Sequence, residues 1–441
     1  MEKADIVIHG CLILPMDGKN RIIEDGLIAI ENGKIVYIGK KAKAPSFKSE
    51  NTIDAHGKIA MPGLINCHTH LPMTLLRGIA EDQPLEKWLT ETIWPLEANL
   101  QPDDFYHGAL LGCLEMIKSG TTCFADMYFH EDKIAQAVEK AGLRAVLSQG
   151  IIEAGNKERG ERMFKESVDF AEKYNGYADG RVTTNLGPHA VYSCSPETLA
   201  KVRETASRLN IGIHIHLAES EDMAKEIKEK HGFSEVELLE NLKFLGSDVL
   251  AAHCIHLSNR EMALMAKHKV KIAHNPVANM KIAAGVAKIK DLMSLGITIG
   301  IGTDGPASNN SLDLFESIKI AALLQKLHYQ DPTVLPAGTV LRMATLDAAK
   351  ALRLENSVGS LEVGKEADLI LIDFKKPHLT PMHDPYANIV YATRGSDVDT
   401  VIVQGKIIME NRKVKTLNEN EVMKTAEKTA FDLLTRARSL R

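Results

Sequence analysis

The chain is organised around one stretch, which reads Ala60-Met61-Pro62-Gly63-Leu64-Ile65-Asn66-Cys67-His68-Thr69-His70. In it, a short apolar run contains a Pro-Gly break and ends in two histidines separated by one residue. Residues i and i+2 of an extended strand point to the same face, so His68 and His70 can bring two ring nitrogens to one cation. A single His-x-His motif also occurs as a solvent-facing or hydrogen-bonding pair, so the metal interpretation depends on later segments.

Three later segments have the same layout, an apolar strand that ends in a residue able to bind a metal or transfer a proton. These segments end at His216, His253 and Asp304. In a (β/α)8 barrel the active site is built at the C-terminal ends of several strands. The three side chains and the two histidines of the first motif are therefore predicted to converge.

Strand and helix signals alternate through the middle of the chain, as parallel βαβ units require. The predicted strands lie near residues 62–68, 121–127, 143–150, 181–188, 211–217, 248–254, 270–275 and 297–304. Helical patterns fill the gaps between them, and Ser195 followed by Pro196 is typical of a helix start. The predicted fold class is α/β, with a (β/α)8 TIM barrel.

The two ends of the chain differ from its middle, because both carry short strands separated by turn residues. At 441 residues the chain exceeds a typical barrel of about 250, which leaves room for a second unit. We predict a small β-sandwich built from both ends, with the barrel inserted between them. The predicted limits are 1–58 for the N-terminal part of the sandwich, 59–362 for the barrel, and 363–441 for the C-terminal part with an amphipathic helix over 418–441.

Composition and charge exclude several classes of protein. Hydrophobic residues at 44% and charged residues at 25% are ordinary for a globular enzyme, and a net charge of −5 disfavours a nucleic-acid surface. No window reaches the ~18 apolar residues of a membrane span, and the start lacks the basic and apolar regions of a signal peptide. Six cysteines without a Cys-x-x-Cys pair indicate reduced, buried thiols. We expect a cytoplasmic homo-oligomer that acts on a small molecule, with no nucleic-acid or membrane partner.

Five motifs, in order, resemble the amidohydrolase superfamily over nearly the whole chain. They are Pro62 to His70, His214 to Glu219, His253 to His256, His274 to Pro276 and Gly302 to Gly305. Within that superfamily, further motifs resemble the 5'-methylthioadenosine/S-adenosylhomocysteine deaminases and the related 5'-deoxyadenosine deaminases. These are Leu75 to Gly78, Trp88-Leu89, Trp94 to Glu97, Gly187 to His189 and Ala307 to Ser311.

The predicted metal ligands are His68, His70, His216 and Asp304. Three neutral nitrogens and one carboxylate suit one divalent ion with a position left for water. Binuclear relatives use a carboxylated lysine at the end of the fourth strand, where this chain has Gly187-Pro188-His189. We therefore expect one Zn²⁺ per chain, with Fe²⁺ or Mn²⁺ as alternatives.

Not every histidine in the motifs is a predicted ligand. His214 shares a face with His216 and is predicted to form hydrogen bonds rather than bind the metal. His256 and His274 are predicted to support neighbouring residues or to pack.

Deamination of an aminopurine needs a nucleophile, a proton on the ring nitrogen and later a proton on the departing ammonia. The ion would supply the nucleophile by lowering the pKa of water to about 7. Glu219, three residues beyond His216, is the predicted acid–base group, since zinc deaminases of another fold also use a glutamate that is not a ligand. His253 would stabilise the nucleophile or a developing oxyanion, and Asp304 could accept the proton of the water. The alternative for Glu219 is a solvated loop carboxylate.

A long insert, about 71–100, follows the first strand and exceeds an ordinary βα loop. The resemblance assigns Glu97 in it to the ribose, and one carboxylate can accept hydrogen bonds from two vicinal hydroxyls. The resemblance further implies that His189 contacts purine or ribose and that Ser308 lies near the mouth. Trp88 would form an aromatic wall, with simple loop packing as an equal alternative.

One position departs from the resemblance. Some relatives that accept S-adenosylhomocysteine have an arginine just before the glycine that ends strand three, where this chain has Gln149. Arg162, or alternatively Arg159, is predicted to contact the substrate instead. Whether S-adenosylhomocysteine is accepted as a substrate is therefore left open by the sequence.

The predicted function is hydrolytic deamination of a 5'-substituted adenosine to the inosine analogue and ammonia. The candidate substrates are 5'-methylthioadenosine, 5'-deoxyadenosine and adenosine. A triazine, guanine or cytosine aminohydrolase of the same superfamily is the first alternative, and a non-catalytic binding barrel is the second.

Overall fold

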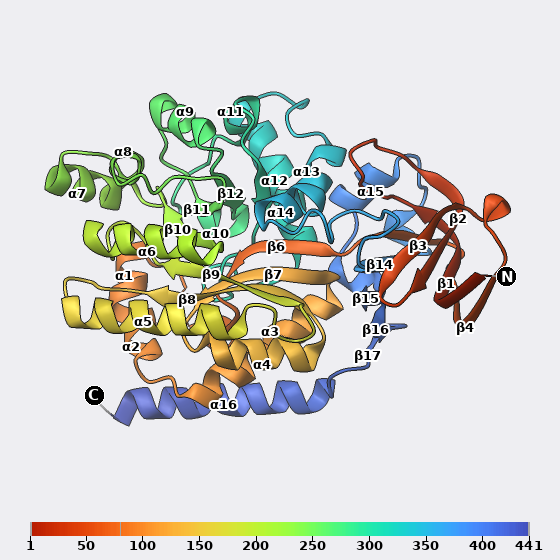
Figure 1. Cartoon of the computed structure of the whole chain (residues 1–441), viewed down its shortest axis with the longest axis horizontal. Helices are drawn as coiled ribbons and strands as arrows, with labels where there is room; N and C mark the ends of the chain where they lie inside the picture. Colours follow the sequence, from red (N-terminus) through yellow and green to blue (C-terminus); the bar gives the residue numbers. More distant parts are fainter. Residues whose placement is uncertain (1, 80, 440–441) are drawn as a thin grey trace.

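The computed structural model describes residues 2–79 and 81–439. In these ranges an eight-stranded parallel sheet, ordered β6 to β13, forms a nearly closed barrel at the centre of the molecule (Figure 1). Its strands are β6 (Leu64–Thr69), β7 (Thr121–Tyr128), β8 (Arg144–Ile151), β9 (Val182–Pro188), β10 (Gly212–Leu217), β11 (Val249–His253), β12 (Lys271–His274) and β13 (Ile299–Ile301). The predicted TIM-like barrel is confirmed.

Every predicted barrel strand overlaps an observed one, and the last strand differs most. It was expected over 297–304, whereas β13 covers only Ile299–Ile301. The chain leaves the ladder early because the amides of Thr303 and Asp304 both donate to the His68 carbonyl, at 3.2 and 2.9 Å. These bonds join the last strand segment to the first.

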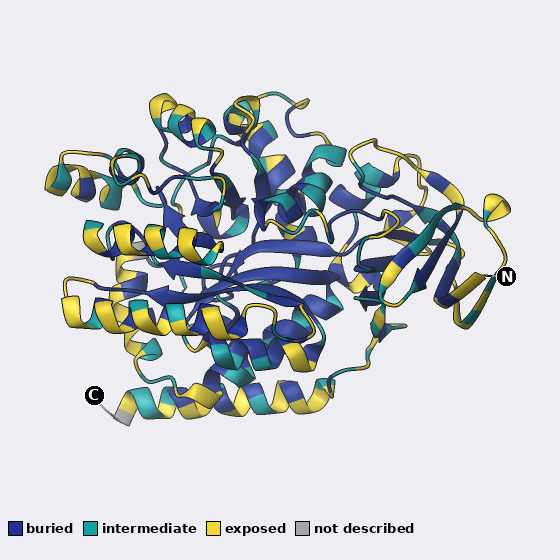
Figure 2. Cartoon of the chain, viewed as in Figure 1, coloured by how far each residue is buried: buried dark blue, intermediate teal, exposed yellow. Residues whose placement is uncertain are grey.

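Helices surround the barrel with one buried and one exposed face, as Figure 2 shows. The observed start of α6 confirms the predicted cap, because Ser195 Oγ accepts a 3.2 Å hydrogen bond from the Thr198 amide. The helices around the barrel are α3 (Pro102–Lys118), α4 (Glu131–Ala141), α5 (Lys157–Tyr174), α6 (Pro196–Leu209), α7 (Glu221–His231), α8 (Glu235–Asn241), α9 (Asn259–Lys267), α10 (Pro276–Lys281), α11 (Ile289–Ser294), α12 (Leu314–Tyr329), α13 (Ala337–Met343) and α14 (Leu346–Ala351).

Both chain ends build the second unit, as predicted, although its strands form one continuous mixed sheet. The order is β17-β16-β15-β14-β5-β1-β2-β3, and β4 pairs with β1. These strands are β1 (Glu2–Ile13), β2 (Ile23–Glu31), β3 (Lys34–Lys40), β4 (Phe47–Asp54), β5 (Lys58–Pro62), β14 (Leu369–Asp373), β15 (Val398–Val403), β16 (Lys406–Glu410) and β17 (Lys413–Val414). Short helices accompany them: η1 (Lys41–Lys43), η4 (Pro377–Leu379), α15 (Pro385–Tyr391) and η5 (Gly395–Asp397).

This sheet curls so that its two halves share a core. The turn at Gly33 meets the turn at Gln404, where a Cβ on Gly33 would lie 3.0 Å from the Gln404 carbonyl oxygen. Apolar side chains from both chain ends fill the interior, among them Ile8, Ile30 and Leu371. The curl gives the sheet the enclosed core that a sandwich requires.

A buried ion pair joins the barrel to the curled sheet. The Arg144 guanidinium, at the start of β8, donates to both carboxylate oxygens of Asp368 at 2.8 and 3.2 Å. The backbone crosses between the two units at Gly63, where a Cβ would lie 2.1 Å from the Thr122 side chain. Because β5 pairs with the curled sheet up to Pro62, we propose Gly63 rather than residue 58 as the first domain limit.

The insert after β6 folds into short helical turns over the barrel mouth. These are η2 (Leu71–Leu76), α1 (Leu85–Lys87), the π-helical turn η3 (Trp88–Ile93) and α2 (Trp94–Glu97). The terminal helix α16 (Glu419–Ser439) runs beneath them along α3 (Figure 1), and residues 440–441 of its predicted range lie outside the described part. Arg436 on α16 pairs with Asp104 and donates to the Asn99 carbonyl at 3.2 Å, which fixes the end of the insert.

Two further expectations concern membranes and thiols. Among the described helices, none is long and apolar enough to cross a membrane. All six cysteines are free and buried, as predicted.

Candidate active site

Four of the predicted residues meet at the C-terminal ends of β6, β10 and β13. The Nε2 atoms of His70 and His216 lie 3.2 Å apart. Asp304 Oδ1 lies 3.4 Å from His68 Nε2 and 3.3 Å from His70 Nε2. The structure thus brings the whole predicted ligand set to one point.

Hydrogen bonds on the far side of each ring aim these histidines at that point. His70 Nδ1 donates to the Met127 carbonyl at 2.6 Å, and His216 Nδ1 donates to the His189 carbonyl at 2.8 Å. His68 Nδ1 lies 2.9 Å from His214 Nε2, so His214 forms hydrogen bonds, as predicted. With Nδ1 engaged, each Nε2 can present a lone pair to a metal.

These residues fit a divalent ion. His68 Nε2 is buried and has no hydrogen-bond partner among the described residues, which is costly unless a ligand satisfies it. Burial lowers the pKa of His68 to about 3 and the pKa of His216 well below its usual range, so both rings are neutral. Burial also lowers the pKa of His70, but the hydrogen bond to Asp304 and its charge outweigh burial and raise this pKa to about 9, so His70 must lose a proton when a metal binds. Three neutral imidazoles and a carboxylate are a typical set for zinc or a similar transition metal.

Glu219 and His253 lie beside the ligand set. Glu219 Oε1 is 3.7 Å from His253 Nε2, and Nδ1 of the same ring is 2.9 Å from the side-chain oxygen of Asn279. Burial raises the pKa of Glu219, so this carboxyl group holds a proton more readily than an exposed one does. Glu219 is thus a buried pocket residue rather than a solvated loop carboxylate.

The backbone turns sharply where these residues leave the barrel. Ala218, His253 and Asp304 have φ values of 51°, 74° and 63°, in the left-handed region that side chains other than glycine rarely adopt. Such strain gathers at functional sites, where the surrounding structure holds it in place.

A pocket in front of the ligands is closed by the insert. It is lined by His70, Met73, Trp88, Leu89, Ile93, Trp94, Glu97, Met127, Tyr128, Phe129, Gly150, Ile152, His189, Tyr192, His216, Glu219, His253 and Asp304. No lysine is among these lining residues. The polar lining consists mainly of histidines, tyrosines and the carboxylates Glu97, Glu219 and Asp304.

Glu97 is the carboxylate that the insert contributes to this pocket. Tyr128 Oη donates a 2.5 Å hydrogen bond to Glu97 Oε1. Burial raises the pKa of Glu97 to about 7, while the Tyr128 hydrogen bond lowers it. The second carboxylate oxygen stays available to a ligand.

His189 and Trp88 line the same pocket, from β9 and from the insert. His189 Nδ1 lies 2.9 Å from Ser193 Oγ, which leaves Nε2 for a ligand. Burial lowers the pKa of His189 to about 3, so the ring is neutral. Trp88 is buried, and its predicted role as an aromatic wall stays a prediction.

Ser308 and Arg162 do not line this pocket. Ser308 Oγ donates to Asp304 Oδ2 at 2.8 Å and so holds the carboxylate that faces the histidines. Arg162 is exposed and lies 3.8 Å from Glu166, on the wall of a second cavity. Their predicted substrate contacts stay predictions.

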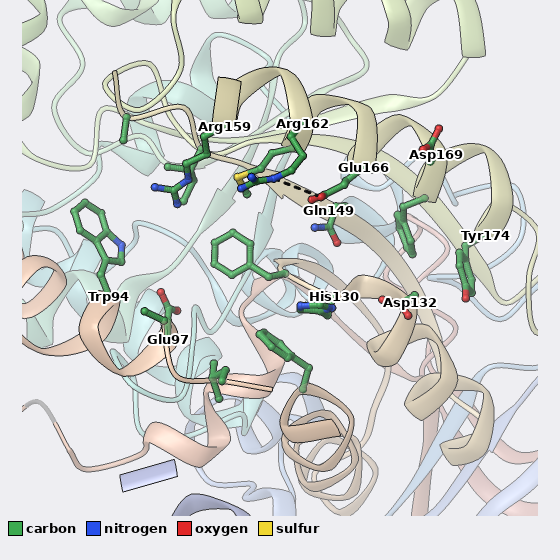
Figure 3. A pocket seen from close by; sticks show the side chains of 18 of the residues that line it. Trp94, Glu97, His130, Asp132, Gln149, Arg159, Arg162, Glu166, Asp169 and Tyr174 are labelled. Carbon is green, nitrogen blue, oxygen red and sulfur yellow. Dashed lines mark ion pairs between the residues drawn. The ribbon is translucent and has the colours of Figure 1, made fainter. Parts of the chain in front are cut away.

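The second cavity, of about 870 Å³, adjoins the first and shares Trp94, Glu97, Phe129 and Ile152 with it. Figure 3 shows Arg159 on the side of Trp94, whereas Arg162 faces Glu166. Gln149 also lines this cavity, and its side-chain oxygen accepts a 3.1 Å hydrogen bond from the Glu131 amide. Gln149, near the end of β8, is therefore held by a hydrogen bond from the backbone.

Two buried carboxyl groups, Asp126 and Glu131, support the pocket from behind. Asp126 Oδ1 accepts from the Leu71 amide at 2.7 Å, and Glu131 Oε1 accepts from the Tyr128 amide at 2.9 Å. Asp126 Oδ2 and Glu131 Oε2 are buried without a hydrogen-bond partner among the described residues, and a proton on one group would let it donate to the other. Burial raises the pKa of Asp126 to about 7, and burial with the neighbouring Asp126 charge raises that of Glu131 well above its usual range, which favours such a proton.

Sequence reasoning missed Tyr128, Tyr192 and Asn279. Tyr128 had a usable signal, since it directly follows the strand predicted over 121–127, where the rule of strand ends applies. Tyr192 lies in the connection after β9 and Asn279 on the short helix α10, where residue order alone does not show which side chain turns back to the mouth.

The chain matches a known protein family. The model of the amidohydrolase family matches residues 59–408. The chain belongs to the amidohydrolase family.

Two similar relatives cover nearly the whole chain. A 5'-deoxyadenosine deaminase from Methanosarcina acetivorans is 49% identical over 98% of this chain and 99% of its own length. A 5-methylthioadenosine/S-adenosylhomocysteine deaminase from Pelotomaculum thermopropionicum is 48% identical over 98% of this chain and 100% of its own. Among solved structures, an adenosine deaminase from Xanthomonas campestris with bound zinc has a TM-score of 0.95 and 32% identity, covering 98% of this chain and 99% of that one.

Proposed function

We propose that this protein is a metal-dependent deaminase that converts a 5'-substituted adenosine to the corresponding inosine analogue and ammonia. The observation that carries the proposal is the position of Glu97, which shares a pocket with Glu219 and the convergent histidines. The two relatives, a 5'-deoxyadenosine deaminase and a 5-methylthioadenosine/S-adenosylhomocysteine deaminase, support the same substrate class.

We propose that His68, His70, His216 and Asp304 hold one zinc ion per chain, with iron or manganese as alternatives. A divalent ion supplies, when bound, a nucleophile at neutral pH by acidifying water. The zinc in the Xanthomonas structure supports the choice of metal.

The proposed proton path runs through Glu219. Its raised pKa suits a group that gives a proton to the purine ring nitrogen and later passes one to the leaving ammonia. Asp304 would accept the proton of the attacking water. His253, oriented by Asn279, would stabilise the negative charge that develops on the attacking oxygen.

The proposed substrate contacts combine a carboxylate, which accepts hydrogen bonds from the ribose diol, with a neutral histidine. Glu97 would accept hydrogen bonds from the two ribose hydroxyls, and His189 would contact purine or ribose through its free Nε2. Trp88 would cover the base, and the adjoining cavity gives room for a 5' substituent. Arg162 or Arg159 would meet a charged 5' group there, so acceptance of S-adenosylhomocysteine depends on them. Ser308 would act through Asp304.

The alternative is a triazine, guanine or cytosine aminohydrolase. Glu97 argues against it, because a substrate without a ribose offers this carboxylate no diol. We further propose a cytoplasmic location, which six unpaired cysteines support, and a homo-oligomeric state.

An ammonia-release screen tests the proposal. The panel contains 5'-deoxyadenosine, 5'-methylthioadenosine, adenosine and S-adenosylhomocysteine beside adenine, guanine, cytosine and melamine. We expect the first three nucleosides to give the highest kcat/KM. A preference for a free base or for the triazine would replace the proposal with its alternative.

A further inference from the structure

A second group of metal-binding residues lies far from the barrel mouth, in the curled sheet. His9 on β1, Asp54 on β4 and His56 just beyond β4 bring one ligand atom each to within 4.8 Å of one another. Figure 1 places β1 and β4 at the opposite end of the molecule from α1 and α2, which cover the active site. This group therefore belongs to a different site.

Strand pairing explains why the three residues meet. His9 and Asp54 are direct partners in the parallel pairing of β1 with β4, and the Ala55 amide donates to the His9 carbonyl at 2.9 Å. The turn after β4 then carries His56 back over β1. The rings of His9 and His56 have centroids 6.0 Å apart.

The backbone at Gly10 makes room for this arrangement. Its φ is 80°, and a Cβ there would lie 2.5–2.7 Å from three ring atoms of His56. The imidazole thus lies directly on the glycine, which restricts the directions that the ring can take. Such restriction lowers the entropic cost of binding a ligand.

Hydrogen bonds leave lone pairs open on both rings. His56 Nδ1 pairs with Asp54 Oδ1, which also accepts from the His56 amide at 3.1 Å. A divalent ion that takes the place of the proton between these two atoms would be bound by both of them, because metal binding displaces the protons of its ligands. His9 Nδ1 is buried and has no hydrogen-bond partner among the described residues, so the group holds an unsatisfied nitrogen.

We propose that His9, Asp54 and His56 form a second, exchangeable site for a divalent transition metal. Two imidazoles and one carboxylate favour Zn²⁺, Ni²⁺ or Cu²⁺ over Ca²⁺ or Mg²⁺, which prefer oxygen ligands. The Asp54 and His56 side chains are 69% and 59% exposed, so water completes the coordination and the ion exchanges readily. A bound ion cross-links β1 to the turn after β4 and stabilises the curled sheet.

The test measures metal uptake by the purified holoenzyme with Zn²⁺ or Ni²⁺ alone as the probe. After dialysis the enzyme is titrated by calorimetry, and Tm is recorded with and without added metal. We expect one further equivalent per chain and a higher Tm. The His56→Gln and His9→Gln variants should bind this equivalent at least about tenfold more weakly and lose the Tm increase.

His383→Gln is the matched control, because His383 is an exposed histidine outside the group. It should bind the additional equivalent like wild type, and all three variants should keep the wild-type kcat/KM. A wild-type enzyme that takes up no additional equivalent, or His56→Gln and His9→Gln variants that still bind it, would overturn the proposal. Either result leaves the assignment of the barrel site untouched.

Discussion

The strand ends of the barrel and the 71–100 insert line one pocket but are held in place differently. The metal-facing rings of His70 and His216 are fixed by carbonyls of neighbouring barrel strands. Glu97 instead lies on α2, a four-residue helical turn, and receives a side-chain hydrogen bond from Tyr128. The rigid strand ends thus suit the reaction, and the insert suits the choice of substrate.

This difference predicts two kinds of defect. Changes at the strand ends should remove the metal or lower kcat for every substrate. Changes at the insert, or at Tyr128, which hydrogen-bonds Glu97, should affect nucleosides more than other substrates. The following variants test whether the two regions give these two different defects.

The largest effect is expected for His216→Ala at the strand ends. The variant should fold, because a residue at the barrel mouth contributes little to the packed core, yet it should lose most of its metal and activity. Metal content and circular dichroism measure this outcome. Full activity without His216, or two tightly held equivalents in the barrel, would contradict the assigned ligand set.

Glu219→Gln should leave metal and substrate binding nearly unchanged. Glutamine keeps the size of the side chain but cannot transfer the proton, so kcat should fall by about 10²–10⁴-fold for every substrate. Steady-state kinetics on two nucleosides checks this. A loss confined to KM would remove Glu219 from the proton path.

The pair Asp126 and Glu131 links both regions through the amides of Leu71 and Tyr128. In Asp126→Asn or Glu131→Gln, the new amide can donate to the remaining carboxylate, so each single change should cost less than about tenfold in kcat/KM. The double variant places two NH₂ groups against each other and leaves one polar group unsatisfied, which costs about 1–3 kcal/mol. Its Tm and kcat/KM should fall by more than the sum of the single effects. Additive losses would mean that no proton is shared.

The pH dependence of nucleoside binding should report on Glu97. Its pKa is raised to about 7 by burial, so the ionised form that accepts two hydroxyls is lost as the pH falls through 7. KM for a nucleoside should therefore rise below about pH 7. Tyr128→Phe removes a hydrogen bond that lowers this pKa, so the rise should begin at a higher pH. If the pH dependence of KM is unchanged in Tyr128→Phe, then Tyr128 does not set the pKa of Glu97.

The barrel and the convergence of the predicted ligand residues could be predicted because the signal is local. Each strand is a short apolar run, and its last residues must lie at the mouth once the strands are parallel. His68, His216 and Asp304 follow from that rule alone. The same rule applied to the end of β7 would have found Tyr128.

The remaining features depend on packing between distant segments. Ser308 is predicted to contact the substrate, and its hydroxyl donates to Asp304 through a contact that is set by the loop after β13 and that the sequence does not indicate. The curl that turns one sheet into an enclosed core depends on the meeting of the turns at Gly33 and Gln404, which no local pattern indicates. Arg162 lies four residues before Glu166 on α5 and faces it across one helical turn. The position of Arg162 relative to the pocket depends on how α5 packs against the barrel.

The central claim is that Glu97 recognises a ribose, and one comparison tests it most directly. The kcat/KM of wild type and Glu97→Gln is measured on 5'-deoxyadenosine and on a matched substrate without the diol, either 2',3'-dideoxyadenosine or adenine. Hydrogen bonds to a charged group contribute about 1.5–3 kcal/mol, so we predict a loss of about 10–100-fold for 5'-deoxyadenosine, mainly in KM, and a much smaller loss for the diol-free substrate. An equal loss on both substrates would contradict the ribose assignment and favour a free-base or triazine aminohydrolase.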